Sequence, residues 1–229
     1  MKMLKAVRNF IIKYRHGWIL SYFFIYMVWF TYLERTVTTK FNPVYSKFDR
    51  LIPFNEVFIL PYLLWFLYIA ATILYFLFTS KTDFYKVCAF LFSGMTICLI
   101  IYTVWPNGHY LRVNLDTLGR SNIFIDMLAS IYSMDTATNV FPSIHTFNSI
   151  GAMFAINQSE KLRNIKWIQF SALILTILIC LSTVFLKQHS VLDLFGGIVL
   201  SAILYAVVYA PNRLKNPSKS KQELFKFFN

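Results

Sequence analysis

The chain has 229 residues, of which 57% are hydrophobic, 19% are aromatic and only 14% are charged. A soluble domain of this size carries about 25% charged residues, so this chain has too little charge to cover a globular surface in water. Its 24 Phe, 14 Tyr and 5 Trp residues exclude an intrinsically disordered chain. The composition therefore predicts an all-α, polytopic membrane protein.

Six apolar stretches are long enough to form transmembrane helices, because a bilayer core of about 30 Å takes roughly 20 residues per helix. They cover residues 17–33, 57–79, 84–105, 141–157, 167–186 and 190–210. We therefore expect a six-helix transmembrane domain over residues 17–210. A cytoplasmic segment at residues 1–16 would lie along the membrane interface, and a basic cytoplasmic tail would cover residues 211–229.

The basic residues follow this expected topology. The chain has 22 Lys and Arg against 10 Asp and Glu, which gives a net charge of +12. If both termini are cytoplasmic, the cytoplasmic segments hold 15 of the basic residues and 3 of the acidic ones, whereas the remainder of the chain holds 7 of each. The positive-inside rule requires this bias. The charge thus indicates orientation in a cytoplasmic membrane and attraction to an anionic leaflet, not a nucleic-acid partner.

Two of the expected outer loops are long. The role of the first, residues 34–56, cannot be read from its sequence. The second, residues 106–140, opens with the turn sequence Pro106-Asn107-Gly108 and contains Ser121-Asn122, either of which could cap a helix. Apolar residues then recur at helical spacing, which predicts a short amphipathic surface helix: Ile123, Phe124, Met127, Leu128 and Ile131.

The three cysteines, Cys88, Cys98 and Cys180, lie inside apolar runs. None of them has Cys-x-x-Cys or Cys/His ligand spacing, and membrane-embedded cysteine usually packs as a small hydrophobic residue. We expect no disulfide, no metal site and no cofactor.

Ionisable side chains gather at one level of the expected bundle. Each costs about 2.5–3.5 kcal/mol at the centre of a membrane helix, so such residues are functional candidates. They all fall at or near the outer ends of helices: Arg112, His145, Lys187, His189 and Asp193. The pattern predicts a functional site on the outer face of the membrane.

His189 and Asp193 are four residues apart at the start of a helix, so they share a face. A carboxylate there can accept the imidazole N–H and fix the tautomer, which leaves the other ring nitrogen usable as a base or nucleophile. The alternative interpretation is a structural His–Asp pair that joins two helices.

The segment Phe141-Pro142-Ser143-Ile144-His145 favours an anion site at a helix start. Proline fits the first turn, and the unpaired backbone N–H groups there, with the Ser143 hydroxyl, can bind an anion. His145 would face the same space, although an isolated histidine is more often a packing residue. Arg112 and Lys187 add cations for phosphate, unless they extend to lipid headgroups. His109 has no partner visible in the sequence.

These residues resemble the motifs of the type 2 phosphatidic acid phosphatase superfamily: KxxxxxxRP, PSGH and SRxxxxxHxxxD. The second motif appears as Pro142-Ser143-Ile144-His145, with Ile144 in place of glycine. The third aligns as Ser182-Thr183, followed by His189 and Asp193, with Thr183 in place of arginine. The first is partial, because Arg112 is followed by Val113 and Trp105 stands at the lysine position. The resemblance covers residues 106–197.

The resemblance implies a phosphoryl transfer that needs no metal. His189 would attack phosphorus and carry a phosphohistidine, Asp193 would orient it, and His145 would protonate the leaving oxygen. Ser143 and Arg112 would bind the phosphate, with Lys187 and Thr183 facing the same pocket in place of missing basic ligands.

Three functions remain open from the sequence. The first is a membrane lipid phosphatase that hydrolyses a lipid phosphate or pyrophosphate at the outer membrane face. The second is a headgroup phosphotransferase, since the third motif looks like the branch near the inositol phosphorylceramide and sphingomyelin synthases. The third is a transporter or scaffold that binds a lipid phosphate without catalysis. The sequence does not specify which lipid is used, or the oligomeric state.

Overall fold

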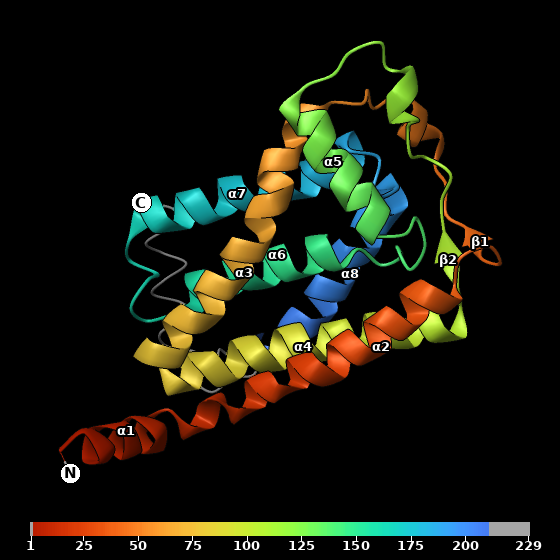
Figure 1. Cartoon of the computed structure of the whole chain (residues 1–229). Helices are drawn as coiled ribbons and strands as arrows, with labels where there is room; N and C mark the ends of the chain where they lie inside the picture. The colour runs from red at the N-terminus through yellow and green to blue at the C-terminus, as the bar shows by residue number, and fades with distance from the viewer. Residues whose placement is uncertain (1, 211–229) are drawn as a thin grey trace.

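The structure is a computed structural model that describes residues 2–210. Within these residues the chain is helical, with one pair of two-residue strands (Figure 1). The α-helices are α1 (Lys2–Lys13), α2 (Tyr22–Thr36), α3 (Ile59–Thr79), α4 (Lys81–Val104), α5 (Ile123–Met134), α6 (Ile144–Gln158), α7 (Lys166–Phe185) and α8 (Val191–Val208). The 3₁₀ helices are η1 (Arg15–Ser21), η2 (Lys47–Arg50), η3 (Glu56–Phe58) and η4 (Leu115–Thr117), and the strands are β1 (Asn42–Pro43) and β2 (Asn107–Gly108).

Four helical segments in the described residues are long and apolar enough to cross a membrane: Glu56–Thr79, Lys81–Val104, Lys166–Phe185 and Val191–Val208. The all-α membrane fold is thus confirmed. Helices α2 and α6 have 15 residues each, which is short for a bilayer core that takes roughly 20. The count of six spans therefore stays a prediction, and the expected tail at residues 211–229 lies outside the described residues.

Polar caps set where several of these helices begin. A side-chain oxygen at the cap accepts a backbone N–H of the first turn, which has no partner inside the helix. Ser80 caps α4, Asn122 caps α5, Ser143 caps α6 and Ser190 caps α8. At α8 the cap is reciprocal, because the Asp193 carboxylate also accepts the Ser190 backbone N–H. Two residues of the expected site are thus capping residues.

Helix α6 packs against α3, α4, α7 and α8. Glycines permit two close approaches in this core. A Cβ at Gly94 of α4 would lie only 2.0 Å from the Phe147 ring, and one at Gly197 of α8 would lie 2.9 Å from the backbone oxygen of Ser143. Phe147 is fully buried and its ring stacks on that of Phe90, with 4.9 Å between centroids. Helix α6, which carries His145, is therefore fixed by packing.

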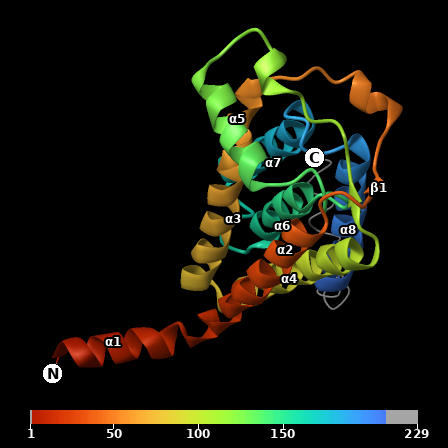
Figure 2. The same cartoon turned by 45° about the vertical axis from the view of Figure 1, so that its right-hand side comes forward.

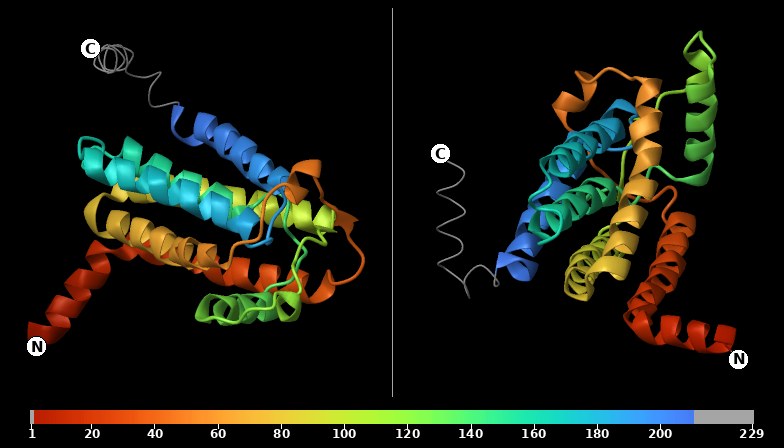
Figure 3. Two further views of the ribbon diagram at one scale, coloured as in Figure 1. Left: turned by 90° about the horizontal axis from the view of Figure 1, so that it is seen from above. Right: turned by 90° about the vertical axis from the view of Figure 1, so that its left-hand side faces the viewer.

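The two long loops, residues 34–56 and 106–140, gather at the same end of the bundle, called the loop end here (Figure 3, left). Strands β1 and β2 join them in parallel, with Asn42 opposite Asn107. The backbone N–H of Val44 donates to the oxygen of Gly108 over 2.7 Å. The 34–56 loop, whose role could not be predicted from the sequence, is thus attached to the second loop beside the site.

The expected surface helix of the second loop is present as α5, and it lies beside the start of α3 (Figure 2). Asn122 caps it and also donates to the Glu56 carboxylate over 3.1 Å. The Arg120 guanidinium donates twice to the same carboxylate, at 2.8 and 2.7 Å. These contacts hold the start of α5 on the start of α3.

Helix α1 projects from the opposite end of the bundle (Figure 1). It exposes the apolar side chains of Leu4, Phe10 and Ile11 beside the basic residues Lys5 and Arg8. This distribution fits the helix expected at the membrane interface.

Candidate active site

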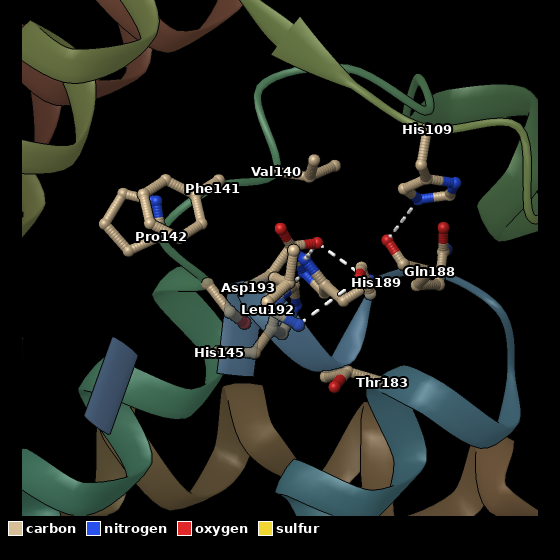
Figure 4. A network of polar contacts seen from close by, with 12 residues as sticks. His109, Val140, Phe141, Pro142, His145, Thr183, Gln188, His189, Leu192 and Asp193 are labelled. Carbon is tan, nitrogen blue, oxygen red and sulfur yellow. Dashed lines mark hydrogen bonds and ion pairs between the residues drawn. The ribbon is translucent and has the colours of Figure 1, made fainter. Parts of the chain in front are cut away.

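The structure brings His145 and His189 together at the loop end (Figure 4). His145 is the second residue of α6, and His189 lies in the turn between α7 and α8. The Nε2 atom of His189 is 3.4 Å from the Nδ1 atom of His145, and the ring centroids are 5.5 Å apart. The two imidazoles expected from separate helices therefore share one space.

Asp193 determines the tautomer of His189. The His189 Nδ1–H group donates to the Asp193 Oδ2 atom over 3.2 Å. The same oxygen accepts the Ser190 backbone N–H over 2.8 Å, so the carboxylate is fixed by the capping box of α8. With its proton on Nδ1, a neutral His189 has a lone pair on Nε2, directed toward His145.

His189 is buried, with 7% of its surface exposed. Burial, with a smaller contribution from the positive charge of Arg112, lowers the pKa of His189 from 6.5 to about 3, against the raising effect of a hydrogen bond to the Val140 backbone. The imidazole is therefore neutral at physiological pH, which is the form a nucleophile or base requires.

The turn that carries His189 is fixed by its own backbone. Both Gln188 and His189 donate their backbone N–H groups to the oxygen of Thr183, over 2.9 and 3.0 Å. Lys187 has a φ of 56°, a left-handed backbone conformation that residues other than glycine rarely adopt. Such a strained backbone persists only where the surrounding contacts hold it in place. These contacts therefore fix the conformation of this turn.

Ser143 lies fully buried at the start of α6. Its backbone N–H donates to the backbone oxygen of Asp193 over 3.0 Å, and its hydroxyl oxygen accepts the Thr146 N–H over 3.3 Å. The expected anion site is therefore only partly open, because the Ser143 N–H already has a partner.

Arg112 reaches the neighbourhood of His189 but is occupied by protein acceptors. Its Nη1 donates to the backbone oxygens of Tyr132 and Asp135, at 3.0 and 2.7 Å. Its Nη2 donates to the backbone oxygen of Thr136 over 2.8 Å and to the Gln188 Oε1 atom over 2.7 Å. Its Nε is buried and has no partner among the described residues. Of the guanidinium donors, only this one remains unpaired.

Lys187 and Thr183, expected to face a phosphate, do not present free donors to the histidine pair. The Lys187 ammonium donates to the backbone oxygens of Asp49 and Ile52, over 2.8 and 2.6 Å. It lines a cavity of about 780 Å³ beside the 34–56 loop that neither His145 nor His189 lines. The Thr183 hydroxyl donates to the Cys180 oxygen over 2.8 Å.

His109 lies beside the same turn (Figure 4). Its Nε2–H donates to the Gln188 backbone oxygen over 2.7 Å, and its Nδ1 accepts the Leu111 N–H over 3.1 Å. Burial lowers the pKa of His109 to about 4, so it is neutral with both nitrogens paired. His109 thus holds the His189 turn and is not a free base.

Two aromatic residues of α3 contact the His145 ring. The centroids of Tyr62 and Trp65 lie 4.7 and 4.4 Å from that of His145. The Trp65 Nε1 is buried and has no hydrogen-bond partner among the described residues. These two rings restrict the position of the His145 ring.

Several of these supporting residues could not be identified from the sequence. Tyr62 and Trp65 lie in an apolar run with no polar signal, and Gln188 is one polar residue among several. Asn107 was visible only as part of a turn, yet its Oδ1 accepts the N–H groups of Val140 and Phe141, at 3.0 and 2.8 Å. Asn107 thereby shapes the entry to α6.

The described residues contain no group of three or more His, Cys, Asp or Glu side chains placed to hold a metal ion. Cys88, Cys98 and Cys180 are free thiols.

Comparison with protein families finds a match over the part of the chain that contains His145, His189 and Asp193. A family model, that of the PAP2 superfamily, matches residues 121–216, a segment that contains all three. No curated protein and no solved structure matches the chain significantly. Members of this superfamily are generally phosphatases or phosphotransferases, which supports an enzyme of that class in a membrane. Residues 121–216 of this chain are thus similar to the PAP2 superfamily.

Proposed function

We propose that the chain is an integral membrane lipid phosphatase that hydrolyses a lipid phosphate or pyrophosphate at the outer membrane face. The observation that carries the proposal is the contact between His189 Nε2 and His145 Nδ1, with Asp193 bonded to the other nitrogen of His189. It supplies a nucleophile with a fixed tautomer and a second imidazole within reach of the same substrate.

In the first step, the Nε2 lone pair of His189 forms a bond to phosphorus while the bond from phosphorus to the leaving oxygen breaks. That oxygen takes a proton from His145. Asp193 stabilises the positive charge that develops on the His189 ring. In the second step, water attacks the phosphohistidine and gives a proton to His145, and the P–N bond breaks to release inorganic phosphate.

The phosphate ligands in this proposal are Ser143 and the Nε–H group of Arg112, the guanidinium donor without a partner among the described residues. At 3.4 Å the two imidazole nitrogens are in direct contact, so phosphate binding moves at least one ring. The His145 ring is the freer of the two to move, because it is held by contacts with aromatic rings, whereas His189 is held by a hydrogen bond to the Asp193 carboxylate.

The decisive experiment is an assay of the purified full-length protein with a panel of phosphorylated lipids. The panel contains phosphatidic acid, phosphatidylglycerol phosphate, a polyprenyl pyrophosphate and a phosphosphingolipid, each with and without a lipid alcohol. Release of inorganic phosphate that is abolished in His189→Ala supports hydrolysis. The matched control is His16→Gln, because the His16 ring bonds to the Leu77 oxygen in another part of the bundle.

The other outcomes separate the remaining functions. A new phosphodiester with no released phosphate would replace hydrolysis with headgroup transfer, and the inositol phosphorylceramide branch would then gain support. Binding of a lipid phosphate without turnover, unchanged in His189→Ala, would contradict both enzymatic functions.

A further inference from the structure

Asp49 of the 34–56 loop binds the start of α8, next to His189. It is buried, with 3% of its surface exposed. Its Oδ2 accepts the Ser190 hydroxyl over 2.7 Å, and its Oδ1 accepts the Val191 N–H over 2.8 Å. We infer that Asp49 is a positioning residue for His189, an inference that rests on the proposed function because it concerns the same site.

The segment that contains Asp49, residues 46–52, is called the strap here. It holds the His189 turn on both sides. Before His189, the Lys187 ammonium donates to the backbone oxygens of Asp49 and Ile52. After His189, Ser190 and Val191 donate to the Asp49 carboxylate. His189 therefore lies between two attachments to one short segment.

The strap is itself rigid at Asp49. Ser46 and Asp49 form a reciprocal cap of η2, in which the Ser46 N–H donates to Asp49 Oδ2 over 2.7 Å. The carboxylate thus accepts three hydrogen bonds, one from its own strap and two from the start of α8. A buried carboxylate with this many donors has little freedom to move.

Asp49 acts on His189 through the start of α8, which carries Asp193. The first N–H groups of α8 need acceptors outside the helix, and Asp49 accepts that of Val191. Asp193 then has to accept only the Ser190 N–H and the His189 Nδ1–H. In Asp49→Asn an NH2 group replaces one of the two acceptor oxygens, so at least one of the three donors to Asp49 loses its acceptor, and the turn that holds Asp193 against His189 loosens.

The position of Asp49 in the chain makes this inference separate from the family match. Asp49 lies far before residues 121–216, the segment that matches the superfamily. The bond to Ser190 spans 141 residues of sequence. The first long loop is therefore part of the site.

The test compares Asp49→Asn with the wild-type protein in detergent, using dioctanoyl phosphatidic acid as the substrate. We expect kcat to fall by about 10- to 100-fold, the range for a supporting residue that orients a reactive group, with KM changed by less than about twofold. Asp49→Glu keeps the charge and should recover part of kcat. The control is Asp116→Asn, an exposed carboxylate in the second loop whose loss should leave both parameters unchanged.

A second readout does not depend on turnover. In histidine-labelled protein, ¹⁵N NMR reports which nitrogen of His189 carries the proton, with His189→Gln used to assign the signal. We expect the Nδ1–H tautomer in the wild type and a mixture of tautomers in Asp49→Asn. An inactive wild type with this tautomer shift would sink the proposed phosphatase but leave the positioning role intact.

Asp49→Asn with normal kcat, or with an unchanged His189 tautomer, would overturn the inference. If that variant does not fold, Ser190→Ala removes the hydroxyl that donates to Asp49 and that also accepts the Leu192 N–H at the start of α8. It should lower kcat by about three- to tenfold, since a hydrogen bond to a charged group and a helix cap are lost. A normal kcat in a folded Ser190→Ala protein would count equally against the role of Asp49.

Discussion

Ser143 donates its backbone N–H to the backbone oxygen of Asp193 over 3.0 Å, so the first turns of α6 and α8 are joined directly. His145 follows Ser143 by two residues, and His189 precedes Asp193 by four. The distance between the two imidazoles is therefore set by one backbone hydrogen bond and by the packing of two helix starts.

The packing at Gly197 tests this coupling. A Cβ at this position would lie 2.9 Å from the Ser143 oxygen and 3.0 Å from the Thr146 Cβ, closer than these atoms tolerate. We expect Gly197→Ala to separate the starts of α6 and α8 and to lower kcat by about tenfold or more, as small misplacements of catalytic groups do. Circular dichroism should show unchanged helix content.

The control for this variant is Ala202→Val, which adds volume on an exposed face of the same helix. It should keep full activity. Full activity in Gly197→Ala would mean that the close approach of the two helices has no role in catalysis.

His145→Asn tests the assignment of the proton donor. If His145 protonates the leaving oxygen, its loss should slow an alkyl phosphate ester by about 10²- to 10⁴-fold, the usual contribution of general acid catalysis. An ester of p-nitrophenol needs little protonation and should be slowed much less. Rates measured on both substrates give the comparison, and an equal loss on both would assign His145 to another role.

The lowered pKa of His189 predicts the pH dependence. Because the pKa of His189 is lowered from 6.5 to about 3 by burial, the nucleophile stays unprotonated well below neutral pH. The acid limb of kcat/KM, which reports the free enzyme, should therefore lie below about pH 5. Measurements between about pH 4 and 8 on a soluble substrate test this, and an acid limb near 6.5 would contradict it.

The same shift has a consequence for stability. Between pH 6.5 and about 3 the unfolded chain binds a proton at His189 that the folded chain does not, so stability falls as pH falls through this window. Above 6.5 the contribution of His189 is constant. The slope is at most about 1.4 kcal/mol per pH unit, and His189→Gln should reduce it.

Arg112→Lys tests whether the guanidinium is structural. Lys cannot reproduce four hydrogen bonds that reach three backbone oxygens and the Gln188 side chain. We expect the free energy of unfolding to fall by about 2 kcal/mol or more, since hydrogen bonds to charged groups contribute about 1.5–3 kcal/mol each. Thermal unfolding in detergent provides the measurement, with the exposed Arg35→Lys as the control. Equal stability of the two variants would argue against this role.

Chelation tests the absence of a metal from the proposed reaction. The two imidazoles and Asp193 supply the nucleophile, the proton donor and the orienting group, so EDTA should leave the rate unchanged. A rate that falls with EDTA and returns with added divalent ion would require a different mechanism.

The sequence predicted the parts of the molecule that follow local rules. The apolar runs predicted the helices, and the spacing of His189 and Asp193 predicted their hydrogen bond. Ser121 and Asn122 were both candidate caps for α5, and Asn122 is the one that caps it. The closeness of His145 to His189 also followed, because both were expected at the same end of the bundle.

The contacts that hold the site depend on long-range packing, which the sequence does not reveal. Lys187 was expected to face a phosphate, but its ammonium binds two carbonyls of a segment more than a hundred residues earlier. Arg112 was expected to clamp the phosphate, but carbonyls of the α5 end occupy its terminal nitrogens. A Lys or Arg side chain near a motif can bind either phosphate oxygens or backbone carbonyl oxygens. The sequence alone does not show which of the two it binds.

The rings of Tyr62 and Trp65 lie against His145 and come from α3, before the family segment begins. A fragment limited to residues 121–216 would therefore carry the three proposed reactive side chains and still leave the imidazole of His145 bare on one side. In a bilayer, acyl chains would cover that flank, and they cannot orient a ring. Such a fragment should bind phosphate poorly and turn over slowly, so the smallest functional unit of the proposed enzyme should extend well beyond the motifs in its sequence.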